Sequence, residues 1–138
     1  RVALWLADLM LTRVLPVTRR SFDLIAPAPS HWRQRLRRGF ETGSVLSHTV
    51  ARGTGIPASP ALRNLSRGKQ AGRSRAARNA QVHIRSTRRV AGRVLLVDDV
   101  VTTGATATAC AHELLASGAQ EVWLATLCYV PATNVQAI

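Results

Sequence analysis

The chain has 138 residues, 46% of them hydrophobic, and its 19 basic and 7 acidic residues give a formal net charge of +12. These values predict one compact globular domain, and the lack of internal repeats excludes a solenoid or a fibre. The two cysteines, Cys110 and Cys128, form no C-x-x-C motif, which argues against a zinc ribbon or a disulfide framework. We expect both to be small buried apolar residues.

Residues 1–20 are expected to form an amphipathic helix. The apolar stretch Val2–Leu15 contains two charged residues and is shorter than the ~20 residues that a membrane-spanning helix needs, so we expect no membrane span. The chain begins with Arg1 rather than Met, which is compatible with residues 1–20 being the remnant of a truncated amino-terminal region. Residues 21–138 are expected to form the main domain.

Strand patterns alternate with helix patterns along this domain, which predicts an α/β fold with a mostly parallel central sheet flanked by helices. Polar, basic residues fill 66–80, so we expect this segment to be mobile without ligand. The predicted strands are Phe22–Ala26, Ala61–Leu65, Val82–Ile84, Val94–Val97 and Glu121–Val130, and the predicted helices are Gly39–Arg52, with Phe40, Val45, Leu46 and Val50 facing inward, and Thr106–Ser117.

The most informative stretch runs from Val94 to Thr106, where an apolar strand ends in two acidic residues and opens onto small hydroxyl residues around a glycine. Asp98 and Asp99 can accept hydrogen bonds from sugar hydroxyls or approach a hydrated Mg²⁺. The threonines and the amides around Gly104 can surround a phosphate at the start of a helix. Neither G-x-x-x-x-G-K-[ST] nor G-x-G-x-x-G occurs, which excludes the usual phosphate-loop and dinucleotide-binding motifs.

The order of apolar strand, two acids and T-T-G-x-T loop resembles the phosphoribosyl pyrophosphate (PRPP) motif of type I phosphoribosyltransferases. The resemblance implies that Asp98 and Asp99 hold the ribose hydroxyls of PRPP and bind Mg²⁺ through water. An ordinary strand-turn-helix connection with two solvated aspartates is the alternative. The resemblance also implies that the 5′-phosphate lies on Thr102, Thr103, Gly104, Ala105 and Thr106.

Within that superfamily, residues 22–130 resemble the ComF family of competence proteins. The sequence differs from the family pattern in two ways. Glu41-Thr42 replaces the family's usual Asn-Gln, and the cysteine-rich zinc finger common in the family is not part of this sequence. The residues that carry the resemblance are Ala26-Pro-Ala-Pro29, Arg35-Leu-Arg-Arg-Gly-Phe40, Leu62-Arg63, Gln70 and Arg78-Asn79.

Two basic regions follow from this resemblance. The loop after the first sheet strand is placed to meet the pyrophosphate, and arginine suits it through bidentate hydrogen bonding. Residues 63–80 resemble a flexible lid that closes over PRPP and excludes water. A stiff strand exit and a solvated basic loop are the alternatives. The implied pyrophosphate-binding residues are Pro27, Ala28, Pro29, Arg35, Arg38 and Arg78, and the implied catalytic residues are Asp98, Asp99, Arg67 and Lys69.

The expected function is phosphoribosyl transfer from PRPP, with Mg²⁺, to an unidentified small acceptor, a nucleobase in the first place. A PRPP-sensing regulator without turnover and a competence accessory protein that binds single-stranded DNA are the alternatives. Few aromatic residues accompany the arginines, which speaks against a stacking platform for DNA. Trp32 and Tyr129 can stack on a base, whereas Trp123 is expected in the core. We expect a cytoplasmic protein, and a homodimer is compatible with the sequence.

Overall fold

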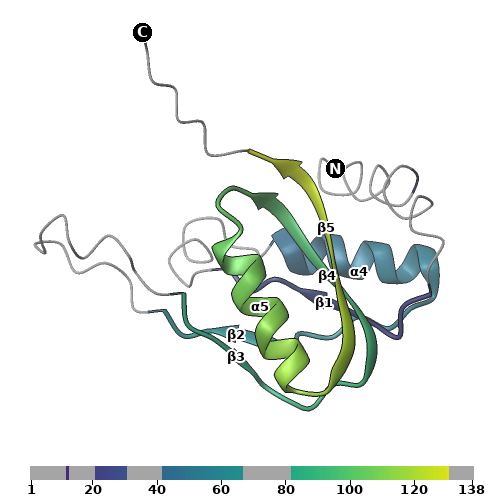
Figure 1. The fold of residues 1–138 in the computed structure, drawn as a ribbon. Helices are drawn as coiled ribbons and strands as arrows, with labels where there is room; N and C mark the ends of the chain where they lie inside the picture. Colours follow the sequence, from purple (N-terminus) through teal and green to yellow (C-terminus); the bar gives the residue numbers. More distant parts are fainter. Residues whose placement is uncertain (1–11, 13–20, 31–41, 67–81, 131–138) are drawn as a thin grey trace, which may run out of the picture.

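The computed structural model describes residues 12, 21–30, 42–66 and 82–130, and its centre is a parallel sheet of three strands (Figure 1). The strands are β1 (Leu24–Pro27), β4 (Gly92–Val101) and β5 (Ala119–Tyr129), in the spatial order β1-β4-β5. Both neighbouring pairs are parallel. The predicted α/β fold with a parallel central sheet is therefore confirmed.

Strand β4 lies in the middle because its four residues Val94–Val97 are buried on both faces of the sheet. Their side chains alternate between two hydrophobic clusters: Val94 and Leu96 belong to one, and Leu95 and Val97 to the other. The predicted end at Val97 is wrong. The strand continues to Val101 because its pairing with β5 extends as far as Tyr129.

The described helices cover opposite faces of the sheet (Figure 1). Helix α4 (Thr42–Thr54) packs Leu46 and Val50 against the cluster of Leu95 and Val97. The expectation for Val45 is wrong, because Val45 is only half-buried and the buried face of the helix consists of Gly43, Leu46, Ser47 and Val50. Phe40 lies outside the described residues.

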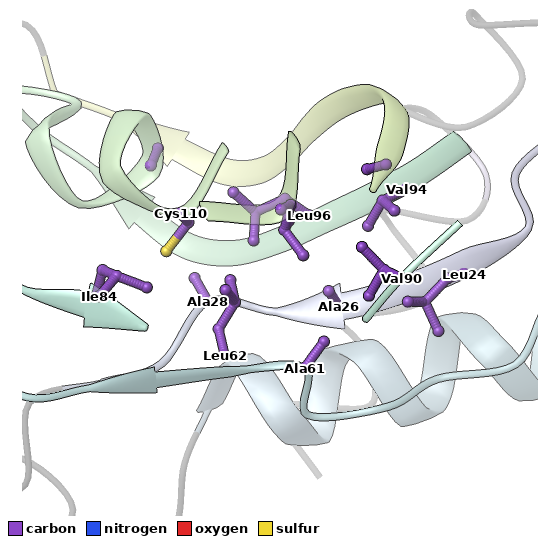
Figure 2. Close-up of a cluster of buried hydrophobic side chains, with 13 residues drawn as sticks. Leu24, Ala26, Ala28, Ala61, Leu62, Ile84, Val90, Val94, Leu96 and Cys110 are labelled. Carbon is purple, nitrogen blue, oxygen red and sulfur yellow. The ribbon is translucent and has the colours of Figure 1, made fainter. Parts of the chain in front are cut away.

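Helix α5 (Ala105–Ala116) packs on the opposite face and buries Cys110 and Leu114. Figure 2 shows Cys110 beside Leu96 at one end of this cluster, with Leu24 and Val90 at the other end. The helix ends at the cap residue Ser117, followed by Gly118 at φ 113°. The predicted range of this helix is confirmed within one residue at each end.

A two-stranded antiparallel ribbon, β2 (Leu62–Asn64) with β3 (Ile84–Ser86), packs beside α5 on the same face of the sheet. Its Leu62 and Ile84 side chains join the cluster around Cys110. Glu113 on α5 accepts a hydrogen bond from the Ser86 amide at 3.1 Å, which ties the helix to β3. The predicted strand Val82–Ile84 is placed too early, since β3 begins at Ile84.

The predicted strand at Glu121–Val130 is confirmed as β5, but the prediction that it is buried is wrong. Only Ala119 and Ala125 are buried, whereas Trp123, Leu124 and Tyr129 are exposed. The reason is position, because β5 forms an edge of the described sheet. Trp123 is therefore not a core residue. Of the two cysteines, Cys110 is buried as expected and Cys128 is exposed.

Several expectations lie outside the described residues. They concern the amino-terminal helix at 1–20 and most of the lid at 63–80, of which residues 63–66 are described. Among the described residues no helix combines the length and the apolar character needed to cross a membrane. Residues 31–41 also lie outside the described part. The basic residues implied to contact PRPP that fall outside the described residues are Arg35, Arg38, Arg67, Lys69 and Arg78.

Candidate donor-binding site

The carboxyl ends of β1 and β4 meet at one edge of the sheet, where open α/β sheets bind ligands. The Ala28 amide donates to the Val97 carbonyl at 2.8 Å, so the chain after β1 stays paired to β4 just before Asp98. This places Pro27, Ala28 and Pro29 at the same edge of the sheet as Asp98. The predicted pyrophosphate loop and the predicted ribose site are thus neighbours through β1 and β4.

Gly43 lets α4 approach this edge closely. A Cβ at this position would lie 3.2 Å from the Ala28 carbonyl oxygen and 3.6 Å from the Val97 carbonyl oxygen. The distance to the Ala28 oxygen is tighter than ordinary van der Waals contact, whereas the distance to the Val97 oxygen is ordinary. A larger residue would therefore push the helix away from the loop at Ala28. Sequence reasoning missed Gly43, although a glycine inside a predicted helix indicates close approach.

Asp98 and Asp99 are the last polar residues of β4 rather than members of a free loop. Both are half-buried, and they occupy successive positions near the carboxyl end of the strand. Each carboxylate bonds locally: Asp98 Oδ1 accepts from the Asp99 amide at 2.9 Å, and Asp99 Oδ1 accepts from the Val100 amide at 2.9 Å. These bonds orient the two carboxylates at the end of the strand.

Burial sets the acidity of the first carboxylate. It raises the pKa of Asp98 from 3.8 to about 6; the hydrogen bond from the Asp99 amide lowers this pKa, whereas the Asp99 carboxylate raises it. Burial likewise raises the pKa of the Cys110 thiol to about 12, with a smaller contribution from the charge on Asp98. Asp98 follows Val94 and Leu96 in the alternation of β4, which places this carboxylate on the α5 side of the sheet. Cys110 therefore acts as an apolar core residue.

The loop between β4 and α5 turns at Gly104, which has φ 77° and ψ −2° and caps the helix. This left-handed conformation suits glycine because it has no Cβ. The first helical bond runs from the Thr108 amide to the Gly104 carbonyl at 2.8 Å, and no side chain caps the helix. Apart from the Ala105 amide, the amides of the first turn have no side-chain cap and can donate to an anion, with the helix dipole in favour.

The side chains of this loop add hydroxyl groups to the amides. Thr102 and Thr103 are exposed, and Thr103 Oγ1 accepts a long hydrogen bond of 3.4 Å from the Ala105 amide. Thr106 is half-buried in the first turn. The structure therefore gathers the predicted phosphate-binding residues Thr102, Thr103, Gly104, Ala105 and Thr106 on one turn directly after Asp98 and Asp99.

Thr126 on β5 is a site-supporting residue that the sequence did not reveal. Its hydroxyl lies 3.2 Å from the Asp99 carbonyl oxygen and 3.1 Å from the Cys128 carbonyl oxygen, and can donate to either. It also stands opposite Asp98 in the β4–β5 ladder. A threonine inside the apolar run from Val122 to Cys128 is the one signal that could have indicated this position.

The donor atoms present fit Mg²⁺. The described residues contain no group of three or more metal-ligating side chains. Mg²⁺ is commonly held by one or two carboxylates with waters and substrate phosphates completing the octahedron, and two oriented carboxylates satisfy that requirement. The residues that would hold the ion are Asp98 and Asp99.

Comparison with known proteins agrees with this geometry. The family model described as "Phosphoribosyl transferase domain" matches residues 43–137. The chain therefore belongs to the phosphoribosyl transferase domain family, and its motif strand, its Thr-Thr-Gly turn and α5 all lie within the matched range. No curated protein matches the chain.

Solved structures share the fold at low sequence identity. Glutamine PRPP amidotransferase from B. subtilis superposes with a TM-score of 0.62 at 20% identity over 91% of this chain and 26% of its own. Purine phosphoribosyltransferase from Pyrococcus horikoshii gives 0.56 at 21% identity, over 91% and 82%. Adenine phosphoribosyltransferase from Thermoanaerobacter pseudethanolicus gives 0.56 at 22% identity, over 91% and 66%. This chain thus spans about a quarter of the amidotransferase, and the similarity concerns the fold.

Proposed function

We propose that this protein binds PRPP with Mg²⁺ at the carboxyl edge of its sheet and transfers the phosphoribosyl group to a nucleobase. One observation carries the proposal: paired carboxylates at the end of the central strand lead directly into a glycine turn that opens a helix, inside a phosphoribosyl transferase domain. Carboxylates accept from vicinal hydroxyls, and an uncapped helix start binds phosphate. Together they match the two ends of a ribose 5-phosphate.

The mechanism follows from charge. Transfer breaks the bond between C1 of the ribose and pyrophosphate, and positive charge develops on the sugar as negative charge grows on the leaving group. Asp98 and Asp99 would orient the ribose through its hydroxyls, while the amides between Thr103 and Thr106 would fix the 5′-phosphate. Mg²⁺ held at the two carboxylates would supply positive charge to the pyrophosphate. The turn that begins at Pro27 would line the pyrophosphate side.

Tyr129 is our candidate for contact with the acceptor base. It is 65% exposed and lies opposite Val101 in the β4–β5 ladder, next to the start of the phosphate turn. An exposed ring at this position can stack on a planar base. We expect Tyr129→Ala to raise the KM for the acceptor while PRPP affinity stays unchanged. Trp123→Ala is the matched control, an exposed aromatic six residues earlier on the same strand and away from this edge.

Calorimetry with PRPP, with and without Mg²⁺, tests the binding site directly. The double variant Asp98→Asn/Asp99→Asn should lose Mg²⁺-dependent affinity, because amides neither bind the ion nor accept as strongly from hydroxyls. Undiminished binding in this variant would reject the site. Release of pyrophosphate with a panel of nucleobases then tests turnover. Tight PRPP binding without release across the panel would favour a PRPP-sensing regulator.

The finer family assignment is also a proposal. We place the chain in the ComF branch on the residues quoted above, of which Pro27–Pro29 and Leu62-Arg63 lie in described segments. A DNA-binding role has one observation in its favour, since Arg63 and Arg85 stand directly opposite each other on the β2–β3 ribbon and both are exposed. Like charges in that position repel, and a phosphate backbone relieves the repulsion. Salt-sensitive binding of single-stranded DNA that survives Asp98→Asn/Asp99→Asn would support this role.

A further inference from the structure

A second pocket lies at the opposite edge of the sheet, where β1 and β4 begin. Its volume is about 580 Å³, within the usual range for small-molecule sites. The strand rise of about 3.3 Å per residue puts Asp98 about 20 Å along β4 from Gly92, so the pocket is separate from the donor-binding site. Its lining residues are Asp23, Leu24, Pro57, Ser59, Arg88, Arg89, Val90 and Ala91.

The apolar part of the lining is built into the core. Leu24 and Val90 are buried members of the cluster under α5, and Figure 2 shows them side by side at its end. Pro57 and Ala91 add further apolar surface. A ligand body that enters this pocket would therefore meet hydrocarbon rather than water, which favours an aromatic or aliphatic group.

Backbone hydrogen bonds hold the pocket walls in place. The Ile25 amide donates to the Pro57 carbonyl at 2.9 Å, and the Ser59 amide donates to the Ile25 carbonyl at 3.0 Å, so this wall pairs with β1. The opposite wall is fixed where the Ser86 hydroxyl donates to the Arg88 carbonyl at 2.6 Å. The Val90 amide bonds to Ser117 at 3.1 Å. The site is preformed, which lowers the entropic cost of binding.

The charge of the pocket favours an anion. Asp23 is already engaged, since its Oδ2 accepts from the Arg93 amide at 2.7 Å. Gly92 makes room for this carboxylate, because a Cβ there would overlap Asp23 Oδ2. Arg88 and Arg89 are exposed, and neither guanidinium has a partner among the residues that the structure describes. Two such groups beside an apolar floor suit the forked hydrogen bonding of a carboxylate or phosphate.

We propose that this pocket binds a small amphipathic anion, an aromatic or aliphatic body that carries a carboxylate or phosphate group. The apolar body lies against Leu24 and Val90, and Arg88 and Arg89 bind the anionic group. This site is independent of the donor-binding site, so it stands or falls separately from the proposed transferase function.

Titration of the ¹⁵N-labelled protein with benzoate and with phenyl phosphate, followed by NMR, tests the proposal and distinguishes the two head groups. We expect saturable shifts at the amides of Leu24, Ser59 and Ala91 with at least one of the two probes. Inorganic phosphate has the anionic group without the apolar body, and benzyl alcohol has the apolar body without the anionic group. Both should bind more weakly than the two probes. Saturating PRPP with Mg²⁺ should not displace the probe.

Two variants and a control decide the outcome. Arg88→Gln/Arg89→Gln should weaken probe binding by about tenfold or more, because each charge-assisted hydrogen bond contributes ~1.5–3 kcal/mol. Ser59→Trp, which fills the pocket without changing its charge, should abolish binding. Arg52→Gln/Arg85→Gln removes the same charge from exposed positions outside the pocket and should have little effect. Equal loss in both double variants, shifts confined to Thr102–Thr106, or no saturation at millimolar probe would overturn the proposal.

Discussion

Burial of Asp98 links the proposed ligand chemistry to the stability of the fold. The folded-state pKa of about 6 lies above the ordinary 3.8, so the native state binds this proton more tightly than the unfolded chain does. The resulting stability is fully present below pH about 4 and is lost as the pH rises through 6. Above that pH the half-buried carboxylate is ionised, and its ionisation lowers the stability of the fold. A charged carboxylate at this position is what the proposed ligand requires.

Asp98→Asn should therefore stabilise the protein at pH 8 and have little effect near pH 4. The shift corresponds to roughly 3 kcal/mol, and because the side chain is only half-buried, solvent screening reduces the expected gain to about 1 kcal/mol. Urea unfolding of both proteins at the two pH values measures the difference. A gain of equal size at both values would mean that ionisation of Asp98 is not its cause.

Gly104 offers a test that separates backbone strain from ligand binding. Gly104 has φ 77° and Gly55 has φ 74°, and a Cβ at either position would meet nothing within 4 Å. Alanine at either position should cost about 1–2 kcal/mol of stability, because left-handed backbone is unfavourable for residues with a Cβ. Only Gly104→Ala should also weaken PRPP binding, since only Gly104 sets the amides of the phosphate turn.

Thermal or urea unfolding gives the two stabilities, and calorimetry gives the two affinities. Gly55, which follows α4, serves as the matched control for strain. If both variants bind PRPP like the original protein, the turn at Gly104 does not hold the 5′-phosphate. If both lose affinity equally, the effect comes from overall stability rather than from the site.

Local sequence patterns predicted which segments are strands and helices more reliably than they predicted how deeply each element is buried. The run Val94–Val97 is apolar at every position, which requires burial on both faces, and this placed β4 correctly in the centre. The same reasoning failed for β5, because an apolar composition does not reveal whether another strand or helix covers the far side. Trp123 and Leu124 are exposed for that reason.

At the candidate site, too, the features set by neighbouring residues were predicted and those set by distant segments were not. The sequence predicted the phosphate turn because each residue type there has a local chemical reason. It did not predict the contact between Gly43 and Ala28 or the position of Thr126 beside Asp99, since both depend on pairing between distant segments. The strand end was misplaced because the pairing partner of β4, not its own apolar run, determines where the strand stops.

The hydrogen bond from the Ser86 amide to Glu113 holds the β2–β3 ribbon against α5. The two strands of this ribbon precede and follow residues 67–81 in the sequence. Glu113→Ala should destabilise the protein by about 1–2 kcal/mol, because it removes the acceptor of the Ser86 amide. Glu113→Gln keeps an acceptor oxygen and should retain most of the stability. Amide hydrogen exchange at Ser86 provides the readout, with faster exchange expected only in the alanine variant. Unchanged protection in Glu113→Ala would show that water replaces the bond without loss.

The molecule as a whole depends on burial of the central strand from both sides. Leu95 and Leu96 are each 1% exposed, and they belong to the α4 cluster and the α5 cluster respectively. Because both clusters pack on the same strand, the loss of either should destabilise the domain as one cooperative unit. The covering layer on the α5 side includes the β2–β3 ribbon, which contributes Leu62 and Ile84 to the cluster.

We accordingly expect Leu95→Ala and Leu96→Ala each to lower the free energy of unfolding by about 2–5 kcal/mol, the usual range for a buried leucine. Leu124→Ala, at a position 43% exposed on β5, is the matched control and should cost less than about 1 kcal/mol. Urea unfolding followed by circular dichroism should give one transition for each variant. A large loss from Leu95→Ala with a small loss from Leu96→Ala would show that the ribbon and α5 cover their face only weakly. In that case the turn at Gly104, which begins α5, would not be held rigidly enough to preform a phosphate site.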